Sequence, residues 1–407
     1  MLNTLYTKAP ISEVEAPKVL RRAQDSVNRR RIGLDIMRST AILMVILYHS
    51  FPILDHIEAS SSLASPIKKM RVFSDWFGPL GVDLFFVLSG FLIGAILINT
   101  FLKSEQYNMS QVFNFWIRRW FRTIPNYFFI LTIAFALYHY KYALQFDWHY
   151  YIFSQNLFSP HPKFFGEAWS LAVEEWFYLT LPVFLLLVSR FAKKVPKQKI
   201  IFTTICIYLF TFITVRFVKA FVGNYSDFDA EIRKVVALRL DAVMYGVFVA
   251  YLLRFHAHRV ERIKGLIFII GLTVALSLTI VFYLGVEKFS FYPENRFFRI
   301  FIDSSYFTII PICFAMVLPA AYSFESRKKG MLIAIISQIS LISYSMYLIH
   351  YALIYIPFFK RTEDAPFTNV WLNYLAYWIL VISISALNYR FFENPITKLR
   401  GYLSHKE

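Results

Sequence analysis

Cysteine and charge are both scarce in this sequence of 407 residues. Its two cysteines, Cys206 and Cys313, lie within apolar segments, which argues against a disulfide framework and a cysteine-rich metal site. Charged residues make up only 17% of the chain, well below the level of about a quarter that is typical of soluble domains. The composition therefore excludes an ordinary soluble protein.

Apolar and aromatic residues dominate instead. Hydrophobic residues account for 57% of the chain and aromatic residues for 19%, which suits lipid-facing surfaces and interfacial belts. The net charge of +17 would suggest a nucleic-acid partner in a soluble protein. Here the cations lie in short segments between apolar stretches, so we interpret them as topology signals and expect no nucleic acid. The sequence predicts a polytopic membrane protein in contact with membrane lipids.

Ten apolar stretches are long enough to cross a bilayer. An α-helix needs about twenty residues to span roughly 30 Å of hydrocarbon. The stretches lie at about 33–54, 76–101, 123–141, 168–189, 200–218, 235–253, 265–285, 300–322, 331–358 and 370–391. They predict an all-α, polytopic helical bundle with about ten transmembrane helices.

The lysines and arginines between these stretches predict their orientation. With the N-terminus inside, the inner segments carry 27 of these residues, the outer loops carry 13, and three lie within spans. Because cytoplasmic segments are enriched in cations, we expect both termini to be cytoplasmic. We further expect a basic cytoplasmic tail at 1–31, one membrane domain at 32–395 and a short cytoplasmic tail at 396–407. We expect no signal peptide, because no short apolar core directly follows the first charges.

Arg38 and His49 are polar residues inside the first apolar stretch. Eleven residues separate them, or roughly 16 Å along a helix, which is about half of the hydrocarbon thickness. Such residues need a partner or a water-filled site, so Asp35, three residues before Arg38, is the expected counter-charge. His49 either marks the interfacial end of the span or has a functional role.

A cluster of cations precedes the third stretch. In the sequence RRWFR at 118–122, Arg119 and Arg122 are three residues apart and project from one face of a helix. Two guanidinium groups that converge in this way can bind phosphates through bidentate hydrogen bonds. The alternative is an interfacial helix that is anchored by its aromatic residues and by anionic lipid headgroups.

Carboxylates lie near the predicted outer ends of two stretches. Asp83 is either a functional acid or an interfacial helix cap. Glu174 and Glu175 diverge by about 100° on a helix, so we expect one to face the bundle and the other to face outward. We expect Glu174 to face inward, because Trp169 and Glu174 bracket the same broad face.

Further polar positions complete the set. Ser89 is a small residue at which a helix or a ligand can approach closely. Arg239 and Asp241 offer an intramembrane charge pair that is most simply structural. His350 is either a satisfied core histidine or a residue that positions an acceptor. No spacing suggests a bound metal or another bound cofactor.

The predicted topology divides these residues between the two sides of the membrane. The outer half holds His49, Asp83, Glu174 and His350, and the inner half holds Arg38, Arg119 and Arg122. A transmembrane transferase needs this division, with anion binding facing inward and chemistry facing outward.

Together these motifs resemble acyltransferase family three, the integral-membrane O-acyltransferases that modify bacterial surface glycans. They occur in family order within residues 32–395, as Arg38 with His49, GVDLFFVLSGF at 81–91, RRWFR at 118–122, WSLAVEEWFY at 169–178, RLDA at 239–242, SYSMYLIH at 343–350 and FFENP at 391–395. The resemblance implies a ten-span bundle in the bacterial cytoplasmic membrane, and acyl-CoA, usually acetyl-CoA, as the cytoplasmic donor. It also implies a hydroxyl acceptor, such as lipopolysaccharide O-antigen, and essential roles for the residues at Arg38, His49, Arg119 and Arg122.

Two features depart from the family pattern. Ile36 and Met37 replace the usual small, flexible stretch before Arg38, and no fused extracytoplasmic hydrolase-like domain is expected in this chain. The chain therefore either acylates its acceptor directly or passes the acyl group to a separate partner.

The residues suggest a division of roles in such a transfer. Arg119 and Arg122 are expected to hold the phosphates of CoA, with Arg38 closer to the pantetheine. His49 either acts as general base on a sugar hydroxyl or accepts the acyl group itself. Glu174 or Asp83 is expected to orient the other ring nitrogen of His49.

The alternative function is a transporter or flippase of a glycan or a lipid-linked sugar. Intramembrane charges suit that function too, although the sequence shows no paired inverted halves.

Overall fold

The computed structural model describes residues 31–56, 64–223, 227–289, 292, 294–325, 330–360 and 365–403. Over these residues the chain forms helices and no strands. The predicted tail at 1–31, apart from Arg31, and the last four residues of the tail at 396–407 lie outside the described residues. The α-helices are α2 (Ile32–Ser50), α3 (Ala64–Lys103), α4 (Met109–Tyr142), α5 (Ala168–Phe191), α6 (Lys197–Val222), α7 (Leu240–Phe255), α8 (Ala257–Tyr283), α9 (Arg296–Ile300), α10 (Phe307–Ser323), α11 (Met331–Ile349), α12 (Ile356–Phe358), α13 (Val370–Asn388) and α14 (Asn394–Leu403).

Nine helices in the described part of the chain are long and apolar enough to cross a membrane. Several of them continue through short π-helical turns, as α11 does through His350–Tyr355 into α12. The predicted sixth span corresponds to α7, which has only 16 residues and begins at Leu240, later than expected. At 1.5 Å per residue α7 is about 24 Å long, shorter than the hydrocarbon core. The prediction of an all-α bundle with about ten membrane helices is confirmed.

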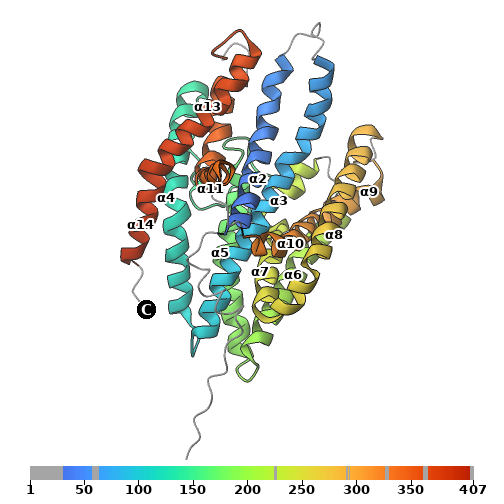
Figure 1. Ribbon diagram of the computed structural model, residues 1–407, viewed down its shortest axis with the longest axis vertical. Coiled ribbons are helices and arrows are strands. Elements are labelled where there is room, and N and C mark those ends of the chain that lie inside the picture. The colour runs from blue at the N-terminus through green and yellow to red at the C-terminus, as the bar shows by residue number, and fades with distance from the viewer. Residues whose placement is uncertain are drawn as a thin grey trace, which may run out of the picture.

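The bundle has two sides around a shared centre. Figure 1 shows α4, α13 and α14 along one side and α8 and α10 along the other. In the centre, α2 packs against both α3 and α11, and α3 packs against α7. Segments from opposite ends of the sequence therefore meet in the core, because α2 is the first described helix and α11 lies about 300 residues later.

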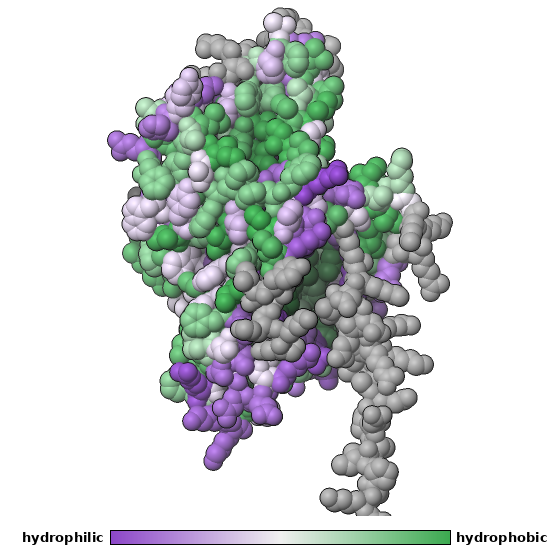
Figure 2. Space-filling view, turned by 90° about the vertical axis from the view of Figure 1, so that its left-hand side faces the viewer, coloured by the Kyte–Doolittle hydropathy of each residue, from purple (hydrophilic) through white to green (hydrophobic). Residues whose placement is uncertain are grey.

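The outer surface is apolar, as a lipid-facing surface requires. Figure 2 shows hydrophobic residues over much of one face and hydrophilic residues gathered toward its lower end. Large apolar side chains such as Phe210 on α6, and Leu266 and Leu276 on α8, are exposed on the helices themselves. An exposed apolar surface of this extent indicates a helical protein that crosses the bilayer several times.

Glycines allow α3 and α7 to cross at very close range. A Cβ atom on Gly90 would overlap the carbonyl oxygen of Val243, and a Cβ atom on Gly246 would overlap the carbonyl oxygen of Val87. Close backbone approach at small residues is a common way for helices to pack in lipid. Gly90 follows Ser89 directly, and Ser89 itself contacts the hydroxyl of Tyr178.

Two buried ion pairs join the central helices, and they differ from the predicted pair. Arg239 forms an ion pair with Asp83 of α3, and Arg216 of α6 forms a bidentate pair with Asp241 at 2.6 and 2.7 Å. The predicted pairing of Arg239 with Asp241 is therefore wrong. Side chains two positions apart point to different sides of a helix, so each found its partner on another helix.

The long segment between α4 and α5 folds back into the bundle. Asn156 is fully buried, and its amide donates hydrogen bonds to the carbonyl oxygens of Trp169 at 3.2 Å and Lys234 at 2.7 Å. The indole of Trp176 donates to the carbonyl oxygen of Phe153 at 2.9 Å. This segment is therefore packed into the membrane domain.

Candidate active site

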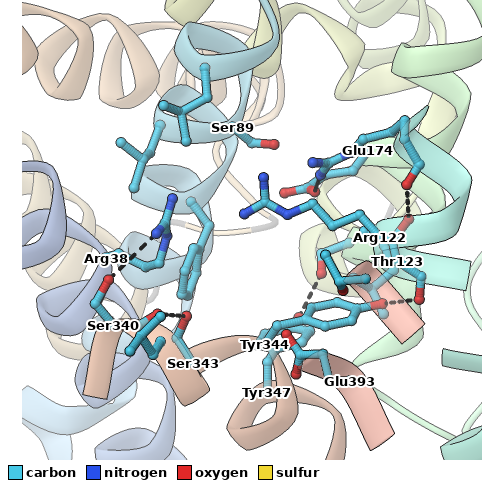
Figure 3. Close-up of a pocket in the computed structure, with 18 of the residues that line it drawn as sticks. Arg38, Ser89, Arg122, Thr123, Glu174, Ser340, Ser343, Tyr344, Tyr347 and Glu393 are labelled. Carbon is cyan, nitrogen blue, oxygen red and sulfur yellow. Dashed lines mark hydrogen bonds and ion pairs between the residues drawn. The ribbon is translucent and has the colours of Figure 1, made fainter. Parts of the chain in front are cut away.

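A cavity of about 390 Å³ lies between the helices, and the three predicted arginines all line it. Arg38 comes from α2, whereas Arg119 and Arg122 come from α4. Figure 3 shows Arg38 and Arg122 approaching the hollow from opposite sides. Arg122 is exposed and lies within a helix that is long and apolar enough to cross a membrane. Two carboxylates, Glu174 and Glu393, line the same space.

Arg38 and Asp35 meet at a serine of α11. The hydroxyl of Ser340 donates to Oδ1 of Asp35 at 2.7 Å and accepts from the guanidinium of Arg38 at 3.4 Å. Asp35 also accepts from Ser337 at 3.4 Å. The expected counter-charge of Arg38 is therefore close by, and a hydroxyl links the two.

Arg119 is held in place by an aromatic and acidic neighbour. Its guanidinium donates to the hydroxyl of Tyr178 at 2.8 Å and lies 3.7 Å from Oε2 of Glu174. The Tyr178 hydroxyl in turn donates to the same Glu174 oxygen at 2.7 Å and contacts Ser89. These bonds fix the direction of the Arg119 side chain toward the cavity and partly balance its charge.

Glu174 and Glu175 do not face the inside and the outside of the bundle, respectively, as predicted. Glu174 faces the cavity, as expected, but it lies with the arginines and not with His49. Glu175 does not face outward, because it is 8% exposed and accepts a hydrogen bond from Thr123 at 2.8 Å. The prediction for Glu175 was wrong because α4 supplies a hydroxyl that satisfies a second buried carboxyl group.

His49 and His350 form a direct pair. Nδ1 of His49 lies 2.8 Å from Nε2 of His350, although 301 residues separate them in the sequence. Neither Glu174 nor Asp83 occupies that position, because Glu174 contacts Arg119 and Asp83 contacts Arg239. The predicted orientation of His49 by a carboxylate is wrong, and His350 is its partner.

The backbone around His350 determines the tautomers of this pair. Nδ1 of His350 lies 3.0 Å from the carbonyl oxygen of Met346 and 2.8 Å from that of Tyr347. Carbonyl oxygens only accept hydrogen bonds, so Nδ1 of His350 carries the proton and Nε2 carries a lone pair. That lone pair accepts from Nδ1–H of His49, so Nε2 of His49 is left unprotonated. An unprotonated imidazole nitrogen can act as a base or as a nucleophile.

Tyr347 lies between the cavity and the histidine pair. It lines the cavity together with Phe85, and the two rings meet edge to face with centroids 6.2 Å apart. The ring of Tyr347 is also 5.9 Å from the ring of His350. One side chain thus separates the arginine-lined space from the histidines.

The remaining predicted residues have other surroundings. Trp169 is buried, with the guanidinium of Arg233 4.7 Å from its ring centre. Neither Trp169 nor the ion-paired Asp83, Arg239 and Asp241 is among the described residues that line the cavity. Their contacts are with neighbouring helices, which indicates a role in holding the bundle together.

Sequence reasoning missed Tyr178, Tyr347 and Glu393 as residues of the site. Tyr178 follows Glu174 by four residues and Tyr347 precedes His350 by three, so helical spacing carried a signal for both. Glu393 accepts from Ser345 at 2.5 Å and from Asn126 at 3.3 Å. It lies in the motif FFENP at 391–395, but its position at the cavity depends on how the last helices pack.

Comparison with known proteins identifies the family. A family profile described as an acyltransferase domain matches residues 31–390. O-acetyltransferase OatA of Staphylococcus aureus (strain NCTC 8325 / PS 47) is 25% identical over 393 residues, which cover 90% of this chain and 57% of that relative. A putative O-acetyltransferase of Staphylococcus aureus (strain COL) is 25% identical over 390 residues, with the same coverage.

The chain thus spans 57% of the length of the curated relatives that it matches. No solved structure matches it. Because the family profile extends over nearly the whole described bundle, this multi-pass membrane protein belongs to acyltransferase family three.

Proposed function

We propose that this protein is an O-acetyltransferase of the bacterial cytoplasmic membrane, with both termini in the cytoplasm. It would move an acetyl group from cytoplasmic acetyl-CoA to a hydroxyl of an extracytoplasmic glycan, with lipopolysaccharide O-antigen as the first acceptor to test. One observation carries the proposal: Tyr347 lines the cavity together with the three arginines, and its ring also contacts His350 of the histidine pair.

The cavity has the chemistry of a site for a phosphorylated donor. Three guanidinium groups from α2 and α4 converge on it, which offers an anionic ligand several charged donors at once. Guanidinium groups bind phosphates through paired, charge-assisted hydrogen bonds. In the proposed complex, Arg119 and Arg122 hold the phosphates of acetyl-CoA and Arg38 contacts the pantetheine arm. Acetyl-CoA is a substrate here, and no bound cofactor is proposed.

His49 supplies the chemistry in either of two routes. As a general base, its Nε2 takes the proton of the acceptor hydroxyl while the oxygen attacks the thioester carbon. The carbon–sulfur bond breaks, and the proton passes to the CoA thiolate. As a nucleophile, Nε2 attacks the thioester carbon first, the carbon–sulfur bond breaks and CoA departs as its thiolate. The acceptor oxygen then attacks the acetyl-imidazole and frees His49, and the proton of the hydroxyl balances the one that the thiolate takes up. Both routes yield one acetyl ester and one CoA thiol.

His350 supports both routes. Its Nε2 accepts the hydrogen bond from Nδ1 of His49, which orients the ring and stabilises the positive charge that develops on it.

The test is acetyl transfer from radiolabelled acetyl-CoA in membranes that express the protein. Wild type should transfer label to surface glycan, whereas His49→Ala and the double variant Arg119→Ala/Arg122→Ala should not. Arg118→Ala is the matched control, because Arg118 is an exposed neighbour in the same motif that does not line the cavity. Near-normal transfer by His49→Ala would remove this histidine from the mechanism. A folded wild type that moves glycan across the membrane without acetylating it would support a transporter instead.

A further inference from the structure

Glu167 is a buried acid at the junction between the α4–α5 segment and α5. It lies just outside the membrane-spanning helices and is 4% exposed. Its carboxyl oxygen Oε1 accepts the backbone N–H of Ala352 at 3.0 Å. Its carbonyl oxygen accepts the hydroxyl of Tyr347 at 3.1 Å, and that hydroxyl also lies 2.6 Å from the hydroxyl of Ser170. Glu167 therefore holds two points of the chain, Tyr347 in the last turn of α11 and Ala352 in the π-helical turn that follows it.

These two points lie on either side of His350. Tyr347 precedes it by three residues, and Ala352 follows it by two within the π-helical turn His350–Tyr355. A π-helical turn contains one extra residue, and such turns recur at functional sites. Nδ1 of His350 is bonded to the carbonyl oxygens of Met346 and Tyr347 in the last turn of α11. The junction between α11 and the π-helical turn therefore determines where the ring of His350 lies relative to His49.

The segment that carries Glu167 is itself firmly placed. Phe165, two residues earlier, is buried and has a positive φ of 45°, a conformation that side-chain-bearing residues adopt only where the surroundings enforce it. The Asn156 bonds to Trp169 and Lys234 tie the same segment to α5 and to the segment before α7. A fixed support of this kind can hold a neighbouring turn in one position.

We propose that Glu167 is a positioning residue of the acyltransferase: it clamps the chain on both sides of His350 and thereby sets the hydrogen bond between His350 and His49. The inference rests on the proposed role of the histidine pair. Nothing in the clamp requires Glu167 to touch a substrate. Its effect reaches His49 through His350.

The protonation of the Glu167 carboxyl group makes the clamp detectable through the pH dependence of stability. Burial raises the pKa of this carboxyl to about 8. Oε2 has no hydrogen-bond partner in the described part of the chain, which suits a neutral carboxyl group near pH 7. The ionisable groups that interact electrostatically with it are tyrosines of the surrounding elements, including Tyr138, Tyr150 and Tyr351.

The sign of the pH effect follows from this raised pKa. Between pH 4.5, the ordinary value for glutamate, and pH 8, the folded protein keeps a proton that the unfolded chain has lost. The free energy of unfolding therefore falls as the pH rises through this range. Glutamine at this position accepts the same hydrogen bond and does not ionise, so Glu167→Gln should remove that dependence.

The first experiment measures acetyl transfer and thermal unfolding of the purified full chain from pH 5 to 9. Glu167→Ala should lower kcat by about 100-fold, as displacement of a reacting group by about 1 Å does, with KM for acetyl-CoA close to wild type. Glu167→Gln should restore most of the turnover and lose the pH-dependent part of the stability difference. Gln155→Ala is the matched control, because Gln155 is buried in the same segment and bonds the carbonyl oxygen of Ala168, not the His350 turn.

A second experiment does not depend on acetyl transfer. Carbethoxylation of His49 by diethyl pyrocarbonate, followed by mass spectrometry, reports the state of the unprotonated nitrogen. Glu167→Ala should change this rate, whereas Glu167→Gln and Gln155→Ala should not. Folded Glu167→Ala protein with wild-type kcat and wild-type carbethoxylation would overturn the clamp. Transfer that persists in His49→Ala would remove this histidine from the mechanism, whereas a folded wild type that transfers no acetyl group would refute the proposed function. In either case the carbethoxylation result would still judge whether Glu167 positions the histidine pair.

Discussion

At the scale of single residues, the proposed chemistry depends on two histidines from opposite ends of the chain. His49 belongs to α2 and His350 follows α11, and their ring nitrogens are 2.8 Å apart. Histidine needs its second nitrogen oriented before the first can serve as a base. Here two backbone carbonyls orient His350, and His350 orients His49. A carboxylate, the more familiar partner, is replaced by a neutral imidazole.

His350→Ala should therefore reduce acetyl transfer strongly without unfolding the protein. Loss of the partner leaves the tautomer and the ring direction of His49 undetermined, and removal of such an orienting group costs up to about 100-fold. The measurement is kcat in purified protein, with folding checked by thermal unfolding. His149→Ala is the control, since His149 pairs with Asp147 in an exposed part of the α4–α5 segment. A His350→Ala protein with normal kcat would show that the pair has no catalytic role.

Arg38→Lys should weaken donor binding although the charge is retained. The ammonium group of lysine cannot make the paired hydrogen bonds of a planar guanidinium group, and the shorter lysine side chain loses the contact with Ser340. Loss of one charge-assisted hydrogen bond costs about 1.5–3 kcal/mol, so KM for acetyl-CoA should rise roughly tenfold or more. Steady-state kinetics at varied acetyl-CoA would check this. An unchanged KM with a lowered kcat would place Arg38 nearer the reacting atoms than proposed.

At the scale of helices, the crossing of α3 and α7 holds the two sides of the bundle together. It depends on glycine, because any side chain on Gly90 meets the backbone of Val243. Gly90→Leu should lower the free energy of unfolding by about 1–3 kcal/mol or prevent folding altogether. Gly265→Leu is the matched control, because a Cβ on Gly265 of α8 would have nothing within 4 Å. Equal thermal unfolding of both variants in detergent would contradict the tight crossing.

The buried pair of Asp83 and Arg239 belongs to the same crossing. Asp83→Ala should destabilise the protein by about 3–5 kcal/mol, because it leaves the fully buried Arg239 without its partner. The double variant Asp83→Leu/Arg239→Met should recover much of that stability, since it removes both charges. Thermal unfolding of the three proteins provides the measurement. If the double variant folds well and still lacks transfer activity, the ion pair contributes to transfer as well as to stability.

At the scale of the whole molecule, the direction of the bundle in the membrane decides which side receives acetyl-CoA. The proposed topology places the α4–α5 segment outside and the α5–α6 connection inside. Lys163 and Lys194 are exposed residues in these two places. In protein lacking Cys206 and Cys313, Lys163→Cys should react with an impermeant maleimide in intact cells. Lys194→Cys should react only after lysis. The reverse pattern would place the arginine-lined cavity on the wrong side for a cytoplasmic donor.

The sequence alone determined the architecture and the inventory of chemical groups. Apolar stretches of about twenty residues must become helices in a bilayer, because hydrocarbon offers no other partner for backbone amides. Helical spacing alone also predicted that Arg119 and Arg122 share a face, and both line the cavity.

Only the tertiary structure decided which of these groups meet. Asp83 pairs with Arg239 and His49 with His350, both far along the chain, whereas Asp241 pairs with Arg216 of the preceding helix α6. Glu175 was expected to face outward, but it accepts a hydrogen bond from Thr123 inside the bundle. Glu167 belongs to no quoted motif, yet it contacts the π-helical turn that begins at His350. Local periodicity reports only the face on which a side chain lies. The partner depends on which other helix packs against that face, and that is settled by close packing of the whole bundle.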